Sequence, residues 1–324
     1  MTPMPKRLSS KIVLVLLVTL LSLGSVFAQN DTIKLSSNPD FYAITLRSDI
    51  PIAENIMKAL APNVNKVSTG DLMVMAAMKL LGTPYVAGTL EEGDEEDVRV
   101  YLSKTDCILF VETCMNLALT AKQKGDKADF EALAQNVRQS RYRNGNVRSY
   151  GDRIHYTTEW IRQGEKRGVV NDITLKIGGE VYDHPIYFMT KNYKLYKHLK
   201  DANLSDECCS EESENCTLSQ ATKDYNTIAK VEAELNQKPY TIIPQDKIKA
   251  CEKLIKNGDV ICYMSTTPGL DIAHVAMAYW RKDGKLGFIH ASMAEMKVVI
   301  DKQSIDEYVK GRKGINGIKV IRVR

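Results

Sequence analysis

The order of the expected secondary structure elements is the strongest constraint on what this chain can fold into. Helical apolar spacing comes first, and from Val260 onward the pattern changes to short apolar or alternating runs separated by Gly and Asp. Such runs are typical of strands in a small, mostly antiparallel sheet. Helices followed by clustered strands indicate an α+β fold. The expected strands are 260–266, 274–280, 286–292, 297–301 and 317–323.

Apolar spacing predicts the helices that precede this sheet. Residues 29–50 are expected to be extended and irregular, and we expect Thr69 to cap the second helix. We find no internal repeat and no Pro- or Ser-rich linker, so one domain of about 250 residues is the simplest organisation. The expected helices are 52–60, 69–81, 107–122, 129–138 and 224–235.

The N-terminal segment has the three parts of a secretory signal. Residues 1–11 are basic, 12–23 are apolar, and the segment ends in small residues that place Val26 and Ala28 at a signal-peptidase site. A membrane anchor is the alternative, but the apolar run is short of the about 20 residues that span a bilayer. We therefore expect cleavage after residue 28, no later membrane span, and export to the periplasm or the extracellular space.

The charge balance argues against a nucleic-acid or anionic-membrane surface. The formal net charge is +4, and Lys6, Arg7 and Lys11 lie within the first eleven residues. Without them the balance is about +1, which is too small for such a surface. The expected division is a signal at 1–28, an N-terminal extension at 29–68, and a domain at 69–324 with a polar insertion near 201–220.

The insertion holds three of the seven cysteines, Cys208, Cys209 and Cys216. In an oxidising compartment two of them could form a local disulfide. No histidine lies nearby and the spacing matches no zinc signature, so a disulfide or free thiols are favoured over a metal site. Because the total is odd, at least one cysteine stays unpaired if the others pair within the chain.

Three side chains together suggest nucleophilic catalysis. Cys107 follows Asp106 at the start of a predicted helix, where the helix dipole and free N–H groups favour a thiolate. His274 opens one expected strand and His290 lies on the next, so the turn at 281–285 would bring the two imidazoles side by side. A cysteine, a histidine base and a group that orients this base are the components of cysteine hydrolases. Taken singly, a buried cysteine or histidine is more often structural.

Several motifs resemble the NlpC family of papain-like cysteine peptidases, which cut amide bonds in bacterial cell-wall peptides. They are Gly-Thr-Pro-Tyr-Val at 82–86, Asp-Cys at 106–107, His-Val-Ala at 274–276 and His-Ala-Ser at 290–292. The resemblance implies that Cys107 is the nucleophile, His274 the base and His290 the residue that orients it. It also implies that Tyr85 helps an oxyanion site. The implied fold is papain-like, with the nucleophile at the N-terminus of a helix packed on a small antiparallel sheet.

Further stretches are similar to one branch, the N-acetylmuramoyl-L-alanine amidase-like proteins. They lie at 106–113, 141–145, 150–156 and 266–274, and the similarity runs from about residue 70 to the C-terminus. Ile108 departs from the family, which usually has Ser there, and the Cys-rich stretch has no family counterpart. The resemblance implies cleavage of the amide between N-acetylmuramic acid and L-alanine in peptidoglycan or muropeptides, by a monomer without a cofactor or metal. We consider Asp106, Glu112, Arg153, Tyr156 and Asp271 as further oxyanion or substrate-binding residues.

Three other readings remain open. The enzyme could cut the D-glutamyl–diaminopimelate bond of the same polymer, which is the commoner NlpC specificity. The chain could be a non-catalytic cell-wall binding protein, although it retains Cys107 and His274. A zinc amidase using His274 and His290 lacks a His-Glu-x-x-His pattern and a third clear ligand.

Overall fold

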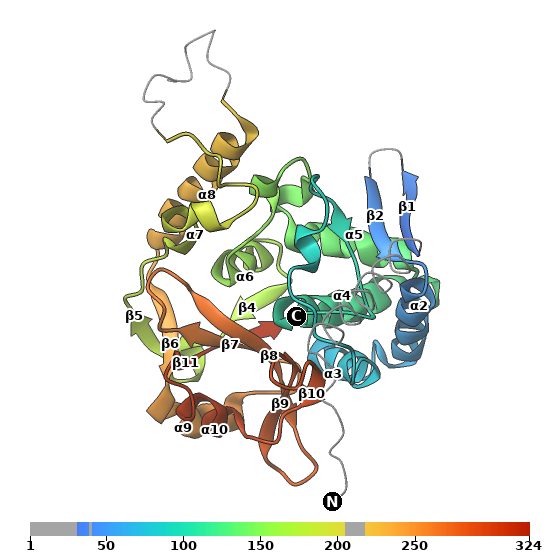
Figure 1. Ribbon diagram of the computed structural model, residues 1–324. Helices are drawn as coiled ribbons and strands as arrows, with labels where there is room; N and C mark the ends of the chain where they lie inside the picture. The colour runs from blue at the N-terminus through green and yellow to red at the C-terminus, as the bar shows by residue number, and fades with distance from the viewer. Residues whose placement is uncertain (1–30, 39–40, 205–217) are drawn as a thin grey trace, which may run out of the picture.

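The computed structural model describes residues 31–38, 41–204 and 218–324 (Figure 1). The expected signal at 1–28 and the cysteines Cys208, Cys209 and Cys216 lie outside these residues. Within the described part of the chain no helix has the length and apolar character needed to cross a membrane.

An eight-stranded antiparallel sheet forms the centre of the molecule. Its strands follow the order β10-β9-β8-β7-β11-β6-β5, and β4 also pairs with β11. All five strands expected from the sequence are present, with ends shifted by at most two residues. The strands are β4 (Val170–Asp172), β5 (Glu180–Tyr182), β6 (Tyr240–Pro244), β7 (Val260–Ser265), β8 (Ile272–Trp280), β9 (Leu286–Ser292), β10 (Lys297–Ile300) and β11 (Ile315–Val323).

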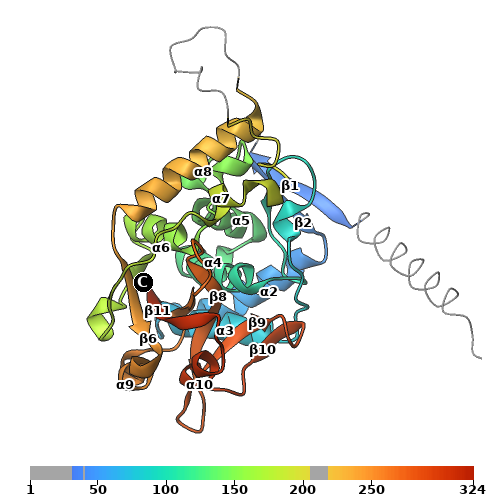
Figure 2. The same ribbon diagram turned by 60° about the vertical axis from the view of Figure 1, so that its left-hand side comes forward.

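Helices cover both faces of this sheet, as Figures 1 and 2 show. The longest, α4, lies on one face against β8 and β9, while α9 and α10 cover the opposite face. All five expected helices are present within a few residues of the predicted ends. The helices are α2 (Asp49–Leu60), α3 (Thr69–Lys79), α4 (Cys107–Lys124), α5 (Phe130–Arg141), α6 (Thr157–Lys166), α7 (Phe188–Lys191), α8 (Gln220–Asn236), α9 (Ile248–Cys251) and α10 (Ile305–Lys310).

Two hydrophobic cores occupy the two faces of the sheet, because side chains alternate along each strand. On β8, Val275 and Met277 point into the larger core with α4, whereas Ala276 and Ala278 point toward α10. His274 lies on the α10 side, where its ring stacks on Tyr263 at a centroid distance of 5.7 Å. The sheet therefore holds this imidazole between buried aromatic rings.

The N-terminal region differs from the expectation in two details. Residues 29–50 contain an antiparallel pair, β1 (Thr32–Asn38) and β2 (Phe41–Leu46), whose register shifts between Leu35 and Asn38. The strand β2 also pairs in parallel with β3 (Val98–Arg99). The helix α3 is capped by Ser68, whose hydroxyl accepts the Asp71 N–H at 3.1 Å, so the expected cap at Thr69 is wrong. The Thr69 hydroxyl instead donates to the carbonyl of Arg324.

Candidate active site

The N-terminus of α4 is fixed by the residue that precedes it. The Asp106 carboxylate accepts the N–H of Leu109 at 2.9 Å, as an N-cap does. Cys107 is then the first residue of an 18-residue helix. Asp106 thus uses its carboxylate to hold the helix end that presents the thiol.

The two histidines lie on β8 and β9, outside the part in which these strands pair with each other. The ladder between β8 and β9 runs from the Trp280–Leu286 pair to the Met277–Ile289 pair, and both histidines lie beyond its end. The helix α4 packs against both strands, and the N–H of Val275 donates to the Cys107 thiol. The thiol therefore lies against β8 at the residue that follows His274.

The two imidazoles are hydrogen-bonded to each other. His274 Nε2 and His290 Nδ1 are 2.7 Å apart, and the ring planes meet at 78°. The expectation that these side chains meet across the turn is confirmed. They are diagonal neighbours on one face of the sheet, and long side chains reach each other across that diagonal. Since this contact uses Nε2 of His274, it leaves Nδ1 as the nitrogen available to a thiol.

A carboxylate that the sequence analysis did not identify lies on the far side of His290. The Asp301 Oδ2 atom is 3.2 Å from His290 Nε2. Asp301 ends the expected strand 297–301, but its relation to His290 depends on the pairing register between β9 and β10. That register cannot be read from a single run of residues, so the sequence held no direct signal for this contact.

Burial dominates the protonation of the three candidate catalytic groups. It raises the pKa of the Cys107 thiol to about 11, and the adjacent Asp106 carboxylate adds to the rise. Burial also lowers the pKa of His274 to about 3, with smaller contributions from His290 and Arg312. The pKa of His290 is lowered by burial too, although Asp301 opposes the change. These shifts favour a neutral thiol and neutral imidazoles at rest, whereas the helix dipole alone favours a thiolate.

Tyr85 lies next to the nucleophile as the resemblance implies. The Tyr85 N–H donates to the carbonyl of Met296, which precedes β10, and on the other side Tyr85 forms a bridge to Thr105. Thr105 immediately precedes the Asp106–Cys107 pair. Burial raises the pKa of the Tyr85 hydroxyl, and nearby Cys107 and Asp106 raise it further. This hydroxyl thus stays protonated and can donate a hydrogen bond.

Two other expected substrate-binding residues are buried in ion pairs. Glu112 accepts from Arg141 and from the Ser140 hydroxyl, and the Glu112 side chain is 4% exposed. The Arg153 side chain is 3% exposed and is bound to Glu91. Both side chains are therefore engaged by internal partners.

Tyr156 and Asp271 are also buried and internally bonded. The Tyr156 hydroxyl donates to Glu232 at 2.6 Å. Asp271 accepts the N–H of Thr158 at 2.7 Å, close to the start of α6. Asp271 therefore joins this helix to the loop that leads into β8 and does not face solvent.

No group of three or more potential metal ligands occurs among residues 31–38, 41–204 and 218–324. His274 and His290 each use one ring nitrogen in the hydrogen bond between them. One of these two nitrogens carries the proton, so it has no lone pair for a metal ion. The geometry thus favours an imidazole pair over the zinc alternative.

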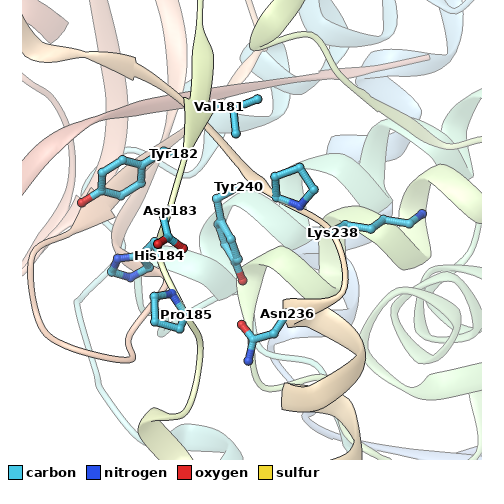
Figure 3. Close-up of a pocket in the computed structure, with 9 residues that line it drawn as sticks. Val181, Tyr182, Asp183, His184, Pro185, Asn236, Lys238 and Tyr240 are labelled. Atoms are coloured by element: carbon cyan, nitrogen blue, oxygen red, sulfur yellow. The ribbon is translucent and has the colours of Figure 1, made fainter.

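A pocket of about 180 Å³ opens elsewhere on the surface, between β5 and the connection from α8 to β6 (Figure 3). Its lining includes none of the candidate catalytic residues. His184, which lines it, bonds the carbonyl of Leu270 at 2.7 Å through Nε2. The pocket therefore adjoins the loop before β8. Its lining residues are Val181, Tyr182, Asp183, His184, Pro185, Asn236, Lys238, Pro239 and Tyr240.

Fold and site together describe an α+β protein with a cysteine at the start of a helix that packs on a sheet, and with two hydrogen-bonded histidines on two neighbouring strands of that sheet. The sequence profile described as "AmiA-like: N-acetylmuramoyl-L-alanine amidase-like" matches residues 75–315. The chain belongs to this family of amidase-like cell-wall hydrolases. The amidase-like branch expected from the sequence is therefore confirmed, whereas membership of the wider NlpC group stays a prediction.

Solved structures share the fold. An N-acetylmuramoyl-L-alanine amidase from Bacteroides uniformis is 30% identical, covers 79% of this chain and 99% of its own, and has a TM-score of 0.68. A Bacteroides fragilis protein that carries a provisional xylanase name is 34% identical, covers 76% and 98%, and has a TM-score of 0.65. A Legionella pneumophila protein of the DUF1460 family is 23% identical, covers 84% and 94%, and shows the fold alone at a TM-score of 0.59. No curated protein matches the sequence.

Proposed function

We propose that this protein is a cysteine amidase of bacterial peptidoglycan fragments, cleaving the amide between N-acetylmuramic acid and L-alanine. The observation that carries the proposal is the placement of Cys107 at the start of α4, against Val275 of β8, with the His274–His290 pair on the same strand and its neighbour. The choice of bond is supported by the family and by the name of the Bacteroides uniformis relative. We further propose that the protein is exported, on the basis of residues 1–28, and acts as a monomer on peptidoglycan or muropeptides.

The first half of the reaction forms a thioester. As Cys107 Sγ attacks the lactyl carbonyl carbon, its proton passes to His274 Nδ1, because both groups are neutral at rest. The Val275 N–H, which donates to the sulfur, favours the developing negative charge. The intermediate then collapses: the C–N bond breaks, and His274 gives its proton to the amine of L-alanine.

The second half releases the sugar. A water molecule attacks the thioester carbonyl while His274 accepts its proton, and the C–S bond breaks to regenerate the Cys107 thiol. During both halves the Cys107 N–H and the Tyr85 hydroxyl would bind the oxyanion. The loss of one such donor typically costs about 10²–10³ in rate.

The chemistry of the site does not favour a glycosidase, despite the provisional xylanase name of one relative. Most glycosidases need two carboxyl groups that flank the scissile bond. Here the carboxylates nearest the thiol and imidazoles are already engaged: Asp106 caps α4, and Asp301 contacts His290.

Digestion of a defined muramyl tripeptide, followed by mass spectrometry, tests the proposal. We expect a free tripeptide and a sugar with a free lactyl carboxylate, and no turnover by a Cys107→Ala variant. The matched control is Cys251→Ala, because Cys251 is a buried thiol on α9 outside the site. A sugar-linked dipeptide product would indicate the D-glutamyl–diaminopimelate endopeptidase instead. Binding of cell wall without any product would indicate a non-catalytic module.

A further inference from the structure

A row of three polar side chains crosses three neighbouring strands on one face of the sheet. Val299 of β10 is paired with His290 of β9, and the Asp301 N–H continues the ladder by donating to Phe288 at 3.0 Å. Because side chains alternate along a strand, Asp301 shares a face with Val299 and therefore with His290. His274 lies on the same face of β8. The order across the sheet is thus His274, His290 and Asp301.

The Asp301 carboxylate is held in place by a second contact. Its Oδ1 atom accepts the Gln303 N–H at 2.8 Å, while Oδ2 lies 3.2 Å from His290 Nε2. The approach to Nε2 is off the ideal hydrogen-bond angle, and no other atom of the described residues satisfies this nitrogen. Since the His290 side chain is only 3% exposed and a buried ring nitrogen requires a polar partner, Asp301 is the group that the structure places within reach of this nitrogen.

We propose that Asp301 is a positioning residue that sets the tautomers of both histidines and so makes His274 Nδ1 the base. The carboxylate accepts a hydrogen bond and so places the His290 proton on Nε2. His290 Nδ1 then carries a lone pair, which accepts from His274 Nε2–H. With its proton on Nε2, neutral His274 carries its lone pair on Nδ1, the nitrogen that remains for the Cys107 thiol. The catalytic part of this inference rests on the proposed function, whereas the tautomers do not depend on it.

The surrounding groups keep the imidazoles of His274 and His290 neutral. The Arg312 guanidinium lies over the Tyr308 ring at 3.4 Å, and its charge disfavours protonation of both imidazoles. The aromatic rings of Tyr308, Phe288 and Tyr263 pack around the pair. Asp301 is the negatively charged group that faces His290 in this region. It therefore decides which ring nitrogen donates and which accepts in each hydrogen bond of the row.

The Asp301→Asn variant tests the proposal because it keeps the shape of the side chain. The single oxygen of the amide is expected to keep accepting the Gln303 N–H, so that its NH₂ faces His290. The NH₂ then donates to His290 Nε2, and His290 Nδ1–H donates to His274 Nε2, so both hydrogen bonds of the row run in the opposite direction. His274 would then carry its proton on Nδ1 and could not accept one from Cys107. We expect kcat to fall by about 10²-fold or more with little change in KM, as when a triad aspartate is replaced by asparagine. The control is Asp283→Asn, at the exposed tip of the β8–β9 turn, which should keep full activity.

Long-range ¹H–¹⁵N NMR correlation of the histidine rings provides a readout that needs no activity. In the unaltered protein we expect the proton on Nε2 of both His274 and His290, and in Asp301→Asn on Nδ1 of both. A His290 proton on Nδ1 in the unaltered protein would overturn the inference, as would full activity with unchanged tautomers in Asp301→Asn. If the unaltered protein cleaves no muropeptide but shows the expected tautomers, the proposed function fails while the role of Asp301 stands.

Discussion

The Cys107 thiol accepts a hydrogen bond from the backbone N–H of Val275, the residue that follows His274 in β8. This contact places the start of α4 against β8 at a residue that lies beyond the last pair of the β8–β9 ladder. Cys107 is half-buried, and the effect of desolvation on the pKa of its thiol exceeds the effects of the surrounding N–H groups. In the proposed mechanism Cys107 therefore starts as a thiol that must be deprotonated during the reaction.

Alkylation of Cys107 by iodoacetamide should depend strongly on pH. Because the thiolate is the reactive form and the pKa of the thiol is raised to about 11, we expect the rate to rise by roughly tenfold per pH unit between pH 7 and 10. Mass spectrometry of the modified site measures the rate, with Cys107→Ala as the blank. Equal rates at pH 5 and pH 8 would instead indicate a preformed thiolate–imidazolium pair.

The stability contributed by His274 should decrease in acid. Its pKa is lowered to about 3 in the folded protein, against an ordinary value of 6.5, so the unfolded chain binds the proton more readily. The contribution is complete above pH 6.5 and is lost as the pH falls toward 3. At pH 5 the loss should be about 2 kcal/mol.

Urea unfolding of the unaltered protein and of His274→Asn at pH 7.5 and pH 5 tests this expectation. Comparison of the two proteins is required because buried carboxyls with raised pKa values, such as Asp49 and Asp271, act in the opposite sense in the same range. Between pH 7.5 and pH 5 the free energy of unfolding of the unaltered protein should fall relative to that of His274→Asn. A constant difference would contradict a neutral, buried His274.

Most of the fold followed from local sequence patterns. Apolar spacing located α3 and α4, and clustered strand-like runs located the sheet from β7 to β11. The short strands β4 and β5 were not foreseen, because three residues carry too little periodicity to separate a strand from a loop. The pairing of β1 with β2 was not foreseen, although its partners lie close in sequence, because residues 29–50 were expected only as extended chain.

The site was predictable where it depends on motifs, and not where it depends on register or burial. The meeting of His274 and His290 followed from two strands joined by a short turn. Asp301 was missed because its partner is set by the pairing of β9 with β10. Arg153 and Glu112 were considered for substrate binding because they lie in the stretches similar to the amidase branch, and their ion pairs became visible only in the folded protein.

Removal of the Tyr85 hydroxyl should slow the chemical step. Tyr85→Phe keeps the ring and the backbone contacts to Met296 and Thr105, so substrate binding should change little. If the hydroxyl binds the oxyanion, kcat should fall by about 10²-fold, at the lower end of the range for one donor. Steady-state kinetics on the muramyl tripeptide measures the effect, and Tyr101→Phe, which lies outside the site and donates to Glu92, is the control. An unchanged kcat would remove Tyr85 from the oxyanion site.

Replacement of Glu112 should affect stability rather than substrate recognition. Glu112 is buried and accepts from Arg141, so Glu112→Ala leaves an unpaired buried cation; such a change typically costs about 3–5 kcal/mol. The double variant Glu112→Ala with Arg141→Met removes both charges and should recover part of this loss. Urea unfolding gives the free energies, and muropeptide cleavage per folded molecule should stay within about threefold, because neither side chain reaches solvent. A large rise in KM at unchanged stability would instead place Glu112 in the substrate site.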